Sequence, residues 1–129
     1  MRIALDTNVL VRVFIDDASS KFQMEQAREL VKKSTEIYIP QIVQAELVWV
    51  LNSAYQLQKS QILVVLEKLV SHSIFLLQEP EIFKAALESF NEGKADFSDY
   101  LIAESAKSVG FRLFSFDKKL IKTEFAEEL

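Results

Sequence analysis

Residues 3–10, IALDTNVL, constrain the fold of this chain more than any other stretch. A short apolar run ends abruptly at Asp6, and Thr7 and Asn8 follow it, which are residue types that begin helices. A second apolar segment with helical spacing continues to Ile15. The stretch therefore predicts a strand, an acid at its carboxyl end and then a helix. Because ligands of open α/β sheets collect at the carboxyl ends of the strands, Asp6 is a candidate site residue.

The same alternation of apolar runs and amphipathic segments continues along the chain. Strands are predicted over residues 2–5, 36–39, 74–77 and 112–116. Helices are predicted over 7–15, 22–33, 42–55, 62–69, 80–90 and 96–109, with Pro40 opening the third from its first turn and Gly110 just past the last. Strands that alternate with helices indicate an α/β fold with a parallel sheet covered on both faces. No composition shift or repeat divides the 129 residues, so a single domain over 1–129 is expected.

Composition excludes several classes of site. The chain has no cysteine, which removes disulfides, zinc–thiolate centres and thiol nucleophiles and fits a reducing compartment. No secretory signal or bilayer-spanning run is visible, so a soluble, cytoplasmic protein with no membrane partner is expected. The net charge of -4 is unusual for a nucleic-acid-binding protein, but four acids that hold divalent metal would bring the remaining charge to -4 + 4 = 0.

Glu46 lies on an apolar segment, where an unpaired carboxylate is costly to bury. Helical spacing places it on one face with Ile42, Val43, Trp49 and Val50. Taken alone, Glu46 is better explained by a position at the edge of a helix that is buried on one side than by a functional role. Trp49 is interpreted as a core residue.

Three further acids occupy similar positions. Asp99 falls on the predicted buried stripe of its helix, and Asp96, three residues earlier, is a predicted N-cap. Asp117 ends the fourth predicted strand as Asp6 ends the first, although a turn or helix cap also explains it. Carboxylates gathered in one cleft need a cation, and a set of oxygen ligands selects Mg²⁺ or Mn²⁺, ions that serve phosphoryl chemistry. The lone histidine, His72, is predicted to be a surface residue at a helix end.

Four blocks in order resemble a known family: Leu5-Asp6-Thr7-Asn8, Glu46, residues 95–103 (ADFSDYLIA) and residues 115–119 (SFDKK). Together they resemble the PIN-domain nucleases, and the small single-domain VapC-type toxins match best, from residue 1 to about residue 122. The resemblance implies an α/β/α sandwich with a central parallel sheet. It also implies an Mg²⁺- or Mn²⁺-dependent endoribonuclease, the toxin of a toxin–antitoxin pair. One departure is the short tail after Asp117, so a fifth strand is short or absent.

The resemblance also implies roles for individual residues. Asp6, Glu46, Asp99 and Asp117 would form the acidic site, with Asp6, Asp99 and Asp117 as metal ligands, and either Glu46 or Asp117 could orient the water instead. Supporting roles fall to Thr7 and Ser115 as nearby hydroxyls, Asn8 as a brace of the loop, and Asp96. Lys118, Lys119, Lys122 and Arg12 are candidates for RNA contact, and for the lysines a solvated charged tail explains the pattern equally well.

The expected partners are RNA, a small antitoxin and a second copy of the chain. The homodimer is also favoured by the apolar segments 42–51 and 62–69, which exceed what a small domain easily covers. One rival interpretation is an aspartyl phosphatase, but that chemistry needs a second acid where Asn8 stands. The other is a nuclease-like fold that binds RNA or protein without catalysis.

Overall fold

The computed structural model describes residues 1–121 and 126–129, so Lys122 lies outside the described residues. The chain divides into two compact units, Met1–Gln78 and Glu79–Leu129, and each is described by itself. The prediction of one domain over residues 1–129 stays a prediction.

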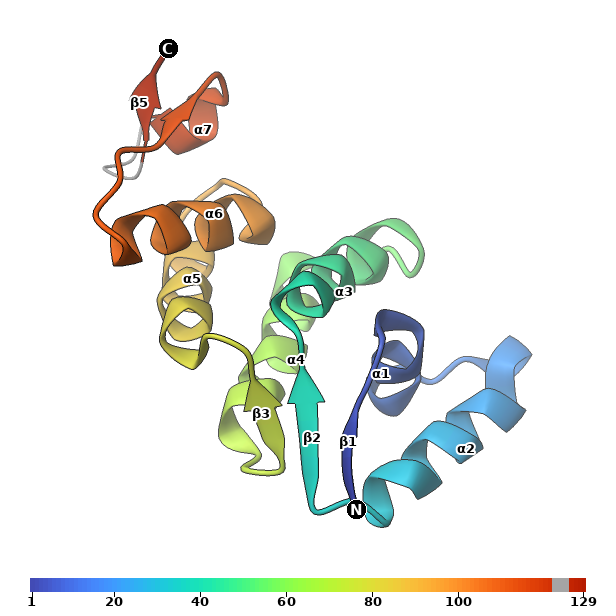
Figure 1. The fold of residues 1–129 in the computed structure, drawn as a ribbon. Helices are drawn as coiled ribbons and strands as arrows, with labels where there is room; N and C mark the ends of the chain where they lie inside the picture. Colours follow the sequence, from blue (N-terminus) through green and yellow to red (C-terminus); the bar gives the residue numbers. More distant parts are fainter. Residues whose placement is uncertain (122–125) are drawn as a thin grey trace. The chain divides into compact units, whose positions relative to one another are not determined.

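The first unit is built on a parallel sheet of three strands in the order β1-β2-β3 (Figure 1). Their bounds are β1 (Arg2–Ala4), β2 (Glu36–Ile39) and β3 (Phe75–Leu77), which confirms the three predicted strands to within a residue. Ala4 lies opposite Tyr38, and Tyr38 opposite Leu76, so all three strands end at the same edge. Ile37 and Ile39 of β2 are fully buried on one face, whereas Tyr38 and Leu76 are 40% and 41% exposed on the other.

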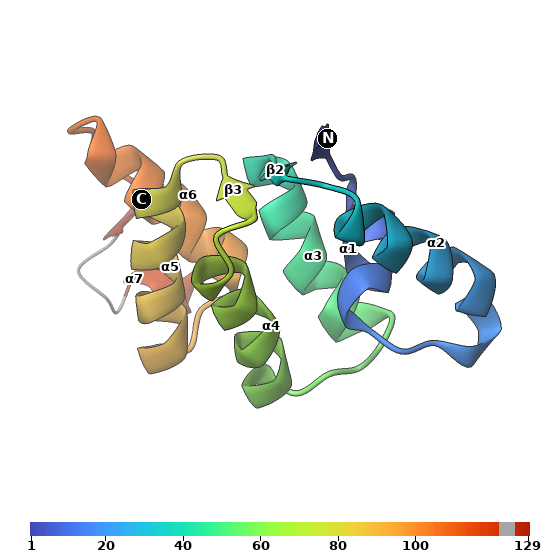
Figure 2. The ribbon, with the colours of Figure 1, turned by 90° about the horizontal axis from the view of Figure 1, so that it is seen from below.

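Helices fill the connections between these strands and lie over the sheet. Their bounds are α1 (Thr7–Phe14), α2 (Lys21–Lys32), α3 (Gln41–Ser53) and α4 (Lys59–Ser71), with a short 3-10 turn at Ala18–Ser20. α1 packs against α2 and α3, and Figure 2 shows α3 beside α4 under β2 and β3. Pro40 was expected within the first turn of a helix, but it is the N-cap of α3 because its extended backbone continues β2.

Several large apolar residues of these helices point outward. Trp49 was expected in the core but is 70% exposed, and Phe22 of α2 is 72% exposed. The buried face of α3 instead consists of Val43, Gln44, Leu47 and Leu51. Because apolar residues lie around almost all of α3, the sequence pattern predicted a helix but not which of its faces is buried.

The second unit consists of two packed helices followed by a short β–α–β segment. Its elements are α5 (Pro80–Glu92), α6 (Phe97–Ser108), β4 (Phe114–Ser115), α7 (Lys118–Ile121) and β5 (Glu127–Glu128). The Phe97 ring packs edge-on against Phe83 and Phe90, with ring centroids 5.5 and 5.7 Å apart, and this cluster joins α5 to α6. Ile102, one turn after Asp99 on the stripe of α6 that was predicted to be buried, is 54% exposed.

The fourth strand is shorter than predicted, whereas the fifth is short, as expected. The fourth strand covers only residues 114–115 of the predicted 112–116, and β5 is a two-residue strand that pairs with it in parallel. Gly110 follows α6 with φ of 78°, as predicted for a residue that ends a helix in the left-handed region. Along the part of the chain that the structure describes, no helix has the length and apolar character to cross a membrane.

Candidate functional site

Asp6 is the N-cap of α1, directly after β1. Its Oδ1 accepts a hydrogen bond from the backbone N–H of Val9 at 3.2 Å, and the side chain is exposed. Thr7 and Asn8 were the residue types expected to begin this helix, but the cap is the acid itself. The position fixes the Asp6 carboxylate at the carboxyl edge of the sheet and at the positive end of a helix dipole.

Thr7 connects the first helix to Glu46 on α3. The buried Thr7 Oγ1 donates to Glu46 Oε1 at 3.1 Å across 39 residues of sequence. This bond replaces the helix-capping bond that a threonine could otherwise make, and it holds the Glu46 carboxylate in one orientation. Glu46 is exposed, as expected of a residue at the edge of a helix that is buried on one side.

In the second unit, Asp96 and Asp99 begin α6 with a reciprocal pair of bonds. The N-cap Asp96 accepts from the backbone of Asp99, and Asp99 Oδ2 accepts from the backbone N–H of Asp96 at 3.2 Å. This capping box confirms Asp96 as the predicted N-cap and gives Asp99 a structural reason to be present.

Capping does not explain the electrostatic environment of Asp99. Partial burial raises the pKa of its carboxyl above the usual value of 3.8, and the charges of Asp96 and Asp117 raise it further. The Asp96 backbone N–H and the charge of Lys119 act in the opposite direction. The charges of two neighbouring carboxylates therefore act on Asp99, an arrangement that a bound cation would relieve.

Asp117 precedes α7 and is held by a local turn. Its backbone N–H donates to Ser115 Oγ at 2.9 Å, while its Oδ1 accepts from the backbone N–H of Lys119 at 2.8 Å. Ser115 thus supports the acid through the main chain. Lys118 and Lys119 are exposed in the first turn of α7.

Arg12, the other candidate for RNA contact, is half-buried and already engaged within the first unit. Its Nε donates to Gln23 Oε1 at 2.7 Å and its NH2 nitrogen donates to Ser20 Oγ at 3.2 Å. It is therefore a positioned guanidinium, not a mobile surface charge. His72 is the exposed C-cap of α4, which confirms its predicted surface position.

The structure thus gives two sets of acids, each within one unit. Asp6 and the Thr7–Glu46 pair belong to the first, and Asp96, Asp99 and Asp117 belong to the second. Among the described residues, no three histidine, aspartate or glutamate side chains gather closely enough to hold a metal ion. The prediction of one site that contains all four candidate acids stays a prediction.

Two polar arrangements near these residues were not predicted. Gln44, fully buried on α3, donates from Nε2 to the carbonyl oxygens of Ile39 and Gln78 at 3.1 and 2.9 Å and so joins the ends of β2 and β3. Tyr55 donates from its hydroxyl to Asp17 Oδ2 at 3.1 Å. The position of Gln44 between two apolar residues was a signal in the sequence for the first arrangement. Nothing in the sequence indicated the bond between Tyr55 and Asp17.

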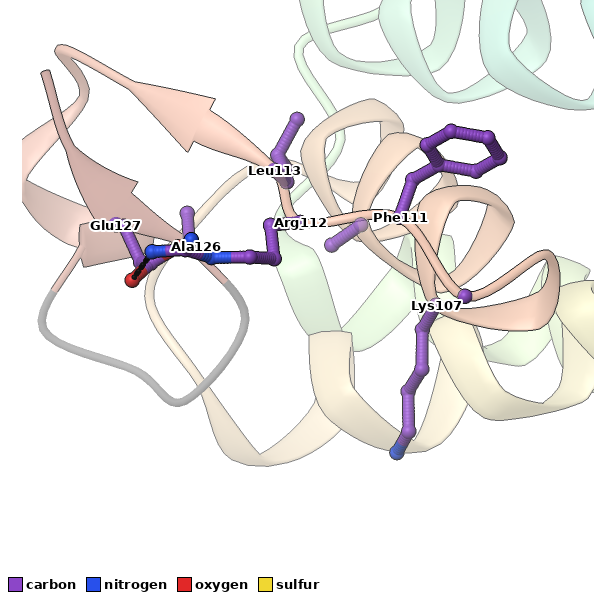
Figure 3. A pocket seen from close by; sticks show the side chains of 8 residues that line it. Lys107, Phe111, Arg112, Leu113, Ala126 and Glu127 are labelled. Atoms are coloured by element: carbon purple, nitrogen blue, oxygen red, sulfur yellow. Dashed lines mark hydrogen bonds and ion pairs between the residues drawn. The ribbon is translucent and has the colours of Figure 1, made fainter.

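The second unit also has a cavity of about 750 Å³ where α6 leads into β4 (Figure 3). Lys107, Phe111 and Leu113 line it, and Arg112 forms one wall by donating to both oxygens of Glu127 at 2.7 and 2.6 Å. This ion pair ties β5 to the segment before β4. No candidate acid lines the cavity, so it is separate from the carboxylates of the second unit.

Comparison with known proteins identifies the family of the chain. Residues 3–126 match the protein family described as PIN domain. The chain is also similar to a protein of Aquifex aeolicus (strain VF5) named "VapC ribonuclease", with 26% identity over 123 residues, which cover 94% of this chain and 91% of the relative.

Proposed function

Because the chain belongs to the PIN-domain family, we propose that it is an endoribonuclease that hydrolyses RNA phosphodiester bonds with a divalent cation, Mg²⁺ or Mn²⁺. The family match across residues 3–126 is the observation that carries the proposal. The similarity to a VapC ribonuclease along nearly the whole chain supports RNA as the substrate.

The available ligands suit a hard divalent cation. The candidate groups offer oxygen atoms alone, the chain has no cysteine, and its single histidine is the exposed cap of α4. We assign Asp6, Asp99 and Asp117 to the cation. When bound, such an ion lowers the pKa of a water molecule and stabilises negative charge on the phosphate.

The remaining roles follow from the contacts of each side chain. Glu46, held by the Thr7 hydroxyl, is oriented to take a proton from the attacking water. Ser115 and Asp96 hold the backbone around Asp117 and Asp99. The Asn8 carboxamide makes no hydrogen bond among the described residues, so its contacts assign it no bracing role. Lys118 and Lys119 contribute phosphate contacts from α7.

The biological setting is part of the same proposal. We expect a cytoplasmic toxin that pairs with a small antitoxin and forms a homodimer. Ile42, Trp49 and Val64, which are 70%, 70% and 54% exposed on α3 and α4, support a protein contact at these helices. Light scattering that shows only monomers at every accessible concentration would contradict the homodimer.

The decisive experiment compares Asp6→Asn with Asp16→Asn. Asparagine is as good an N-cap as aspartate, so Asp6→Asn keeps the cap of α1 while removing the charge. Asp16→Asn makes the same chemical change at an exposed residue whose one ion pair, among residues 1–121 and 126–129, is with Arg28. Cleavage of single-stranded RNA should depend on Mg²⁺ or Mn²⁺ and stop with EDTA. It should fall by orders of magnitude in Asp6→Asn and persist in Asp16→Asn.

Melting temperature, measured on the same preparations, shows whether each variant is folded. Undiminished cleavage by folded Asp6→Asn protein would refute the metal-dependent mechanism. Wild-type protein that binds RNA but never cuts it with any divalent ion would favour a binding module without catalysis.

A further inference from the structure

A cavity of about 330 Å³ lies between α1 and α2, wholly within the first unit. Its apolar floor is formed by Val9, Ala27 and Leu30, at the place where the two helices pack together (Figure 1). The volume falls at the small end of the ~300–1,000 Å³ that is typical of ligand pockets. The cavity is therefore of a size for one flat ring system, and its floor can receive an apolar face.

Polar side chains surround this floor, and most of their hydrogen-bonding groups point to no protein partner. Asn8 and Gln26 are exposed, and in the described part of the chain neither carboxamide makes a hydrogen bond. Gln23 accepts from Arg12 through Oε1, which leaves its amide nitrogen as a donor. Arg12 is held in place by Gln23 and Ser20, so its guanidinium is positioned before any ligand arrives.

This combination of groups matches one class of ligand. A carboxamide presents a donor and an acceptor side by side, which is the pattern that pairs with N6 and N7 of adenine. A guanidinium pairs in the same way with O6 and N7 of guanine. Asn8, Gln26 and Arg12 are thus all side chains that recognise purine edges, and an apolar floor suits the face of a base better than it suits a phosphate.

The place of the cavity connects it to the candidate acids. Asn8 lies in the first turn of α1, two residues after Asp6, and Val9 both lines the cavity and donates its backbone N–H to Asp6. The cavity therefore reaches the first turn of α1, the turn that Asp6 caps.

We propose that the α1–α2 cavity binds a purine base of the RNA strand next to the bond that is cut, and that it sets the sequence preference of the enzyme. This inference rests on the proposed function, since it assigns the substrate of the same site. Gln26 is the residue that tests it best, because Gln26 lines the cavity without belonging to the proposed catalytic groups.

Binding measured in EDTA separates base recognition from cleavage. Fluorescence anisotropy would compare labelled oligoadenylate and oligouridylate strands of equal length on wild-type protein, Gln26→Leu and Asn52→Leu. The last is a matched control, since it removes an exposed carboxamide of α3 that does not line the cavity. Wild type and Asn52→Leu should prefer oligoadenylate, and Gln26→Leu should weaken oligoadenylate binding by about tenfold and leave oligouridylate unchanged.

A second measurement uses the active enzyme. Sequencing the products of a random single-stranded RNA pool cut with Mn²⁺ should show a purine beside the cut for wild type and a weaker preference for Gln26→Leu. Equal binding of both strands by wild type, or an unchanged preference in folded Gln26→Leu, would overturn the proposal and leave the apolar floor for a side chain of a protein partner.

The two proposals fail separately. A preference that depends on Gln26 in EDTA, without cleavage under any metal, would keep the base site and refute the nuclease. Cleavage without any base preference would support the nuclease and refute the base site.

Discussion

Gln44 is the buried side chain whose replacement tests the architecture of the first unit most directly. Its amide nitrogen donates to the carbonyl oxygens of Ile39 and Gln78, and it is completely buried. Its Oε1 is also buried, and among the described residues it accepts no hydrogen bond. Gln44 therefore joins α3 to the ends of two strands, at the edge of the sheet where Asp6 lies.

The expected cost of Gln44→Ala follows from two losses. Each hydrogen bond contributes about 1 kcal/mol net, which gives about 2 kcal/mol for the pair. The truncated side chain leaves a cavity in a packed interior, and this adds about 1–2 kcal/mol. Gln44→Ala should therefore lower the free energy of unfolding by about 3–4 kcal/mol.

Gln44→Leu separates these losses. Leucine fills most of the space and removes the unpaired Oε1, which offsets part of the roughly 2 kcal/mol of lost hydrogen bonding. The expected loss is about 1 kcal/mol. Urea unfolding at constant m would give both values. A Gln44→Leu variant as unstable as Gln44→Ala would show that the cavity contributes nothing, and wild-type stability in both would refute the proposed role of Gln44.

Two further predictions concern turns. Gly93→Ala should lower the free energy of unfolding by about 1–3 kcal/mol, because the added methyl group would collide with the buried Tyr100 hydroxyl and lie 3.0 Å from the Ser89 carbonyl oxygen. At Gly110 an added methyl group meets no atom within 4 Å, so Gly110→Ala should cost only the ~1–2 kcal/mol of a non-glycine residue in the left-handed region. Urea unfolding measures both losses, and equal losses would contradict the collision at Gly93. The side-chain and backbone hydrogen bonds of Ser19, and then that of Tyr55, hold the pKa of Asp17 below its usual 3.8. A carboxyl group whose pKa is lower in the folded chain stabilises the fold at pH values above its unfolded pKa, and this stabilisation is lost as pH falls through the folded pKa. Asp17→Asn should therefore lower the melting temperature at neutral pH and match wild type in thermal melts below the folded pKa of Asp17.

The sequence predicted the elements better than their orientation. Short apolar runs bounded by proline and charged residues predicted β2 to the residue. Pro80 marked a helix start because the fixed φ of proline suits the first turn, and Gly110 marked a helix end because glycine adopts the left-handed region without strain. The apolar pattern of α3 extends around most of the helix, so it could not show that Trp49 is exposed while Gln44 is buried. Which residue faces inward depends on the elements that pack against α3.

For the candidate acids too, local features could be predicted from the sequence and long-range contacts could not. The positions of Asp6, Asp99 and Asp117 at strand ends and a helix start were readable from local sequence, and so was the N-cap Asp96. The cap of α1 was expected at Thr7 or Asn8 and is Asp6 instead. The bond from Thr7 to Glu46 joins residues 39 positions apart, and no local pattern specifies such a pair. Long-range polar contacts of this kind depend on how α1 and α3 pack.

Asp99 is the acid at which stability and the proposed function oppose one another. Burial, together with the charges of Asp96 and Asp117, raises its pKa, so ionisation of Asp99 is less favourable in the folded chain than in the unfolded one. Its contribution to stability is therefore complete below the usual value of 3.8 and is lost as pH rises through the folded pKa. In Asp99→Asn the side chain has no charge to destabilise the fold as pH rises, and its amide oxygen can still accept the hydrogen bond from the backbone N–H of Asp96. In metal-free buffer the variant should melt at a higher temperature than wild type at pH 7 and at the same temperature in acid, while its RNA cleavage with Mn²⁺ is lost. A variant that melts lower at pH 7 would show that the charge of Asp99 stabilises the fold, and the acid would then be explained by capping alone.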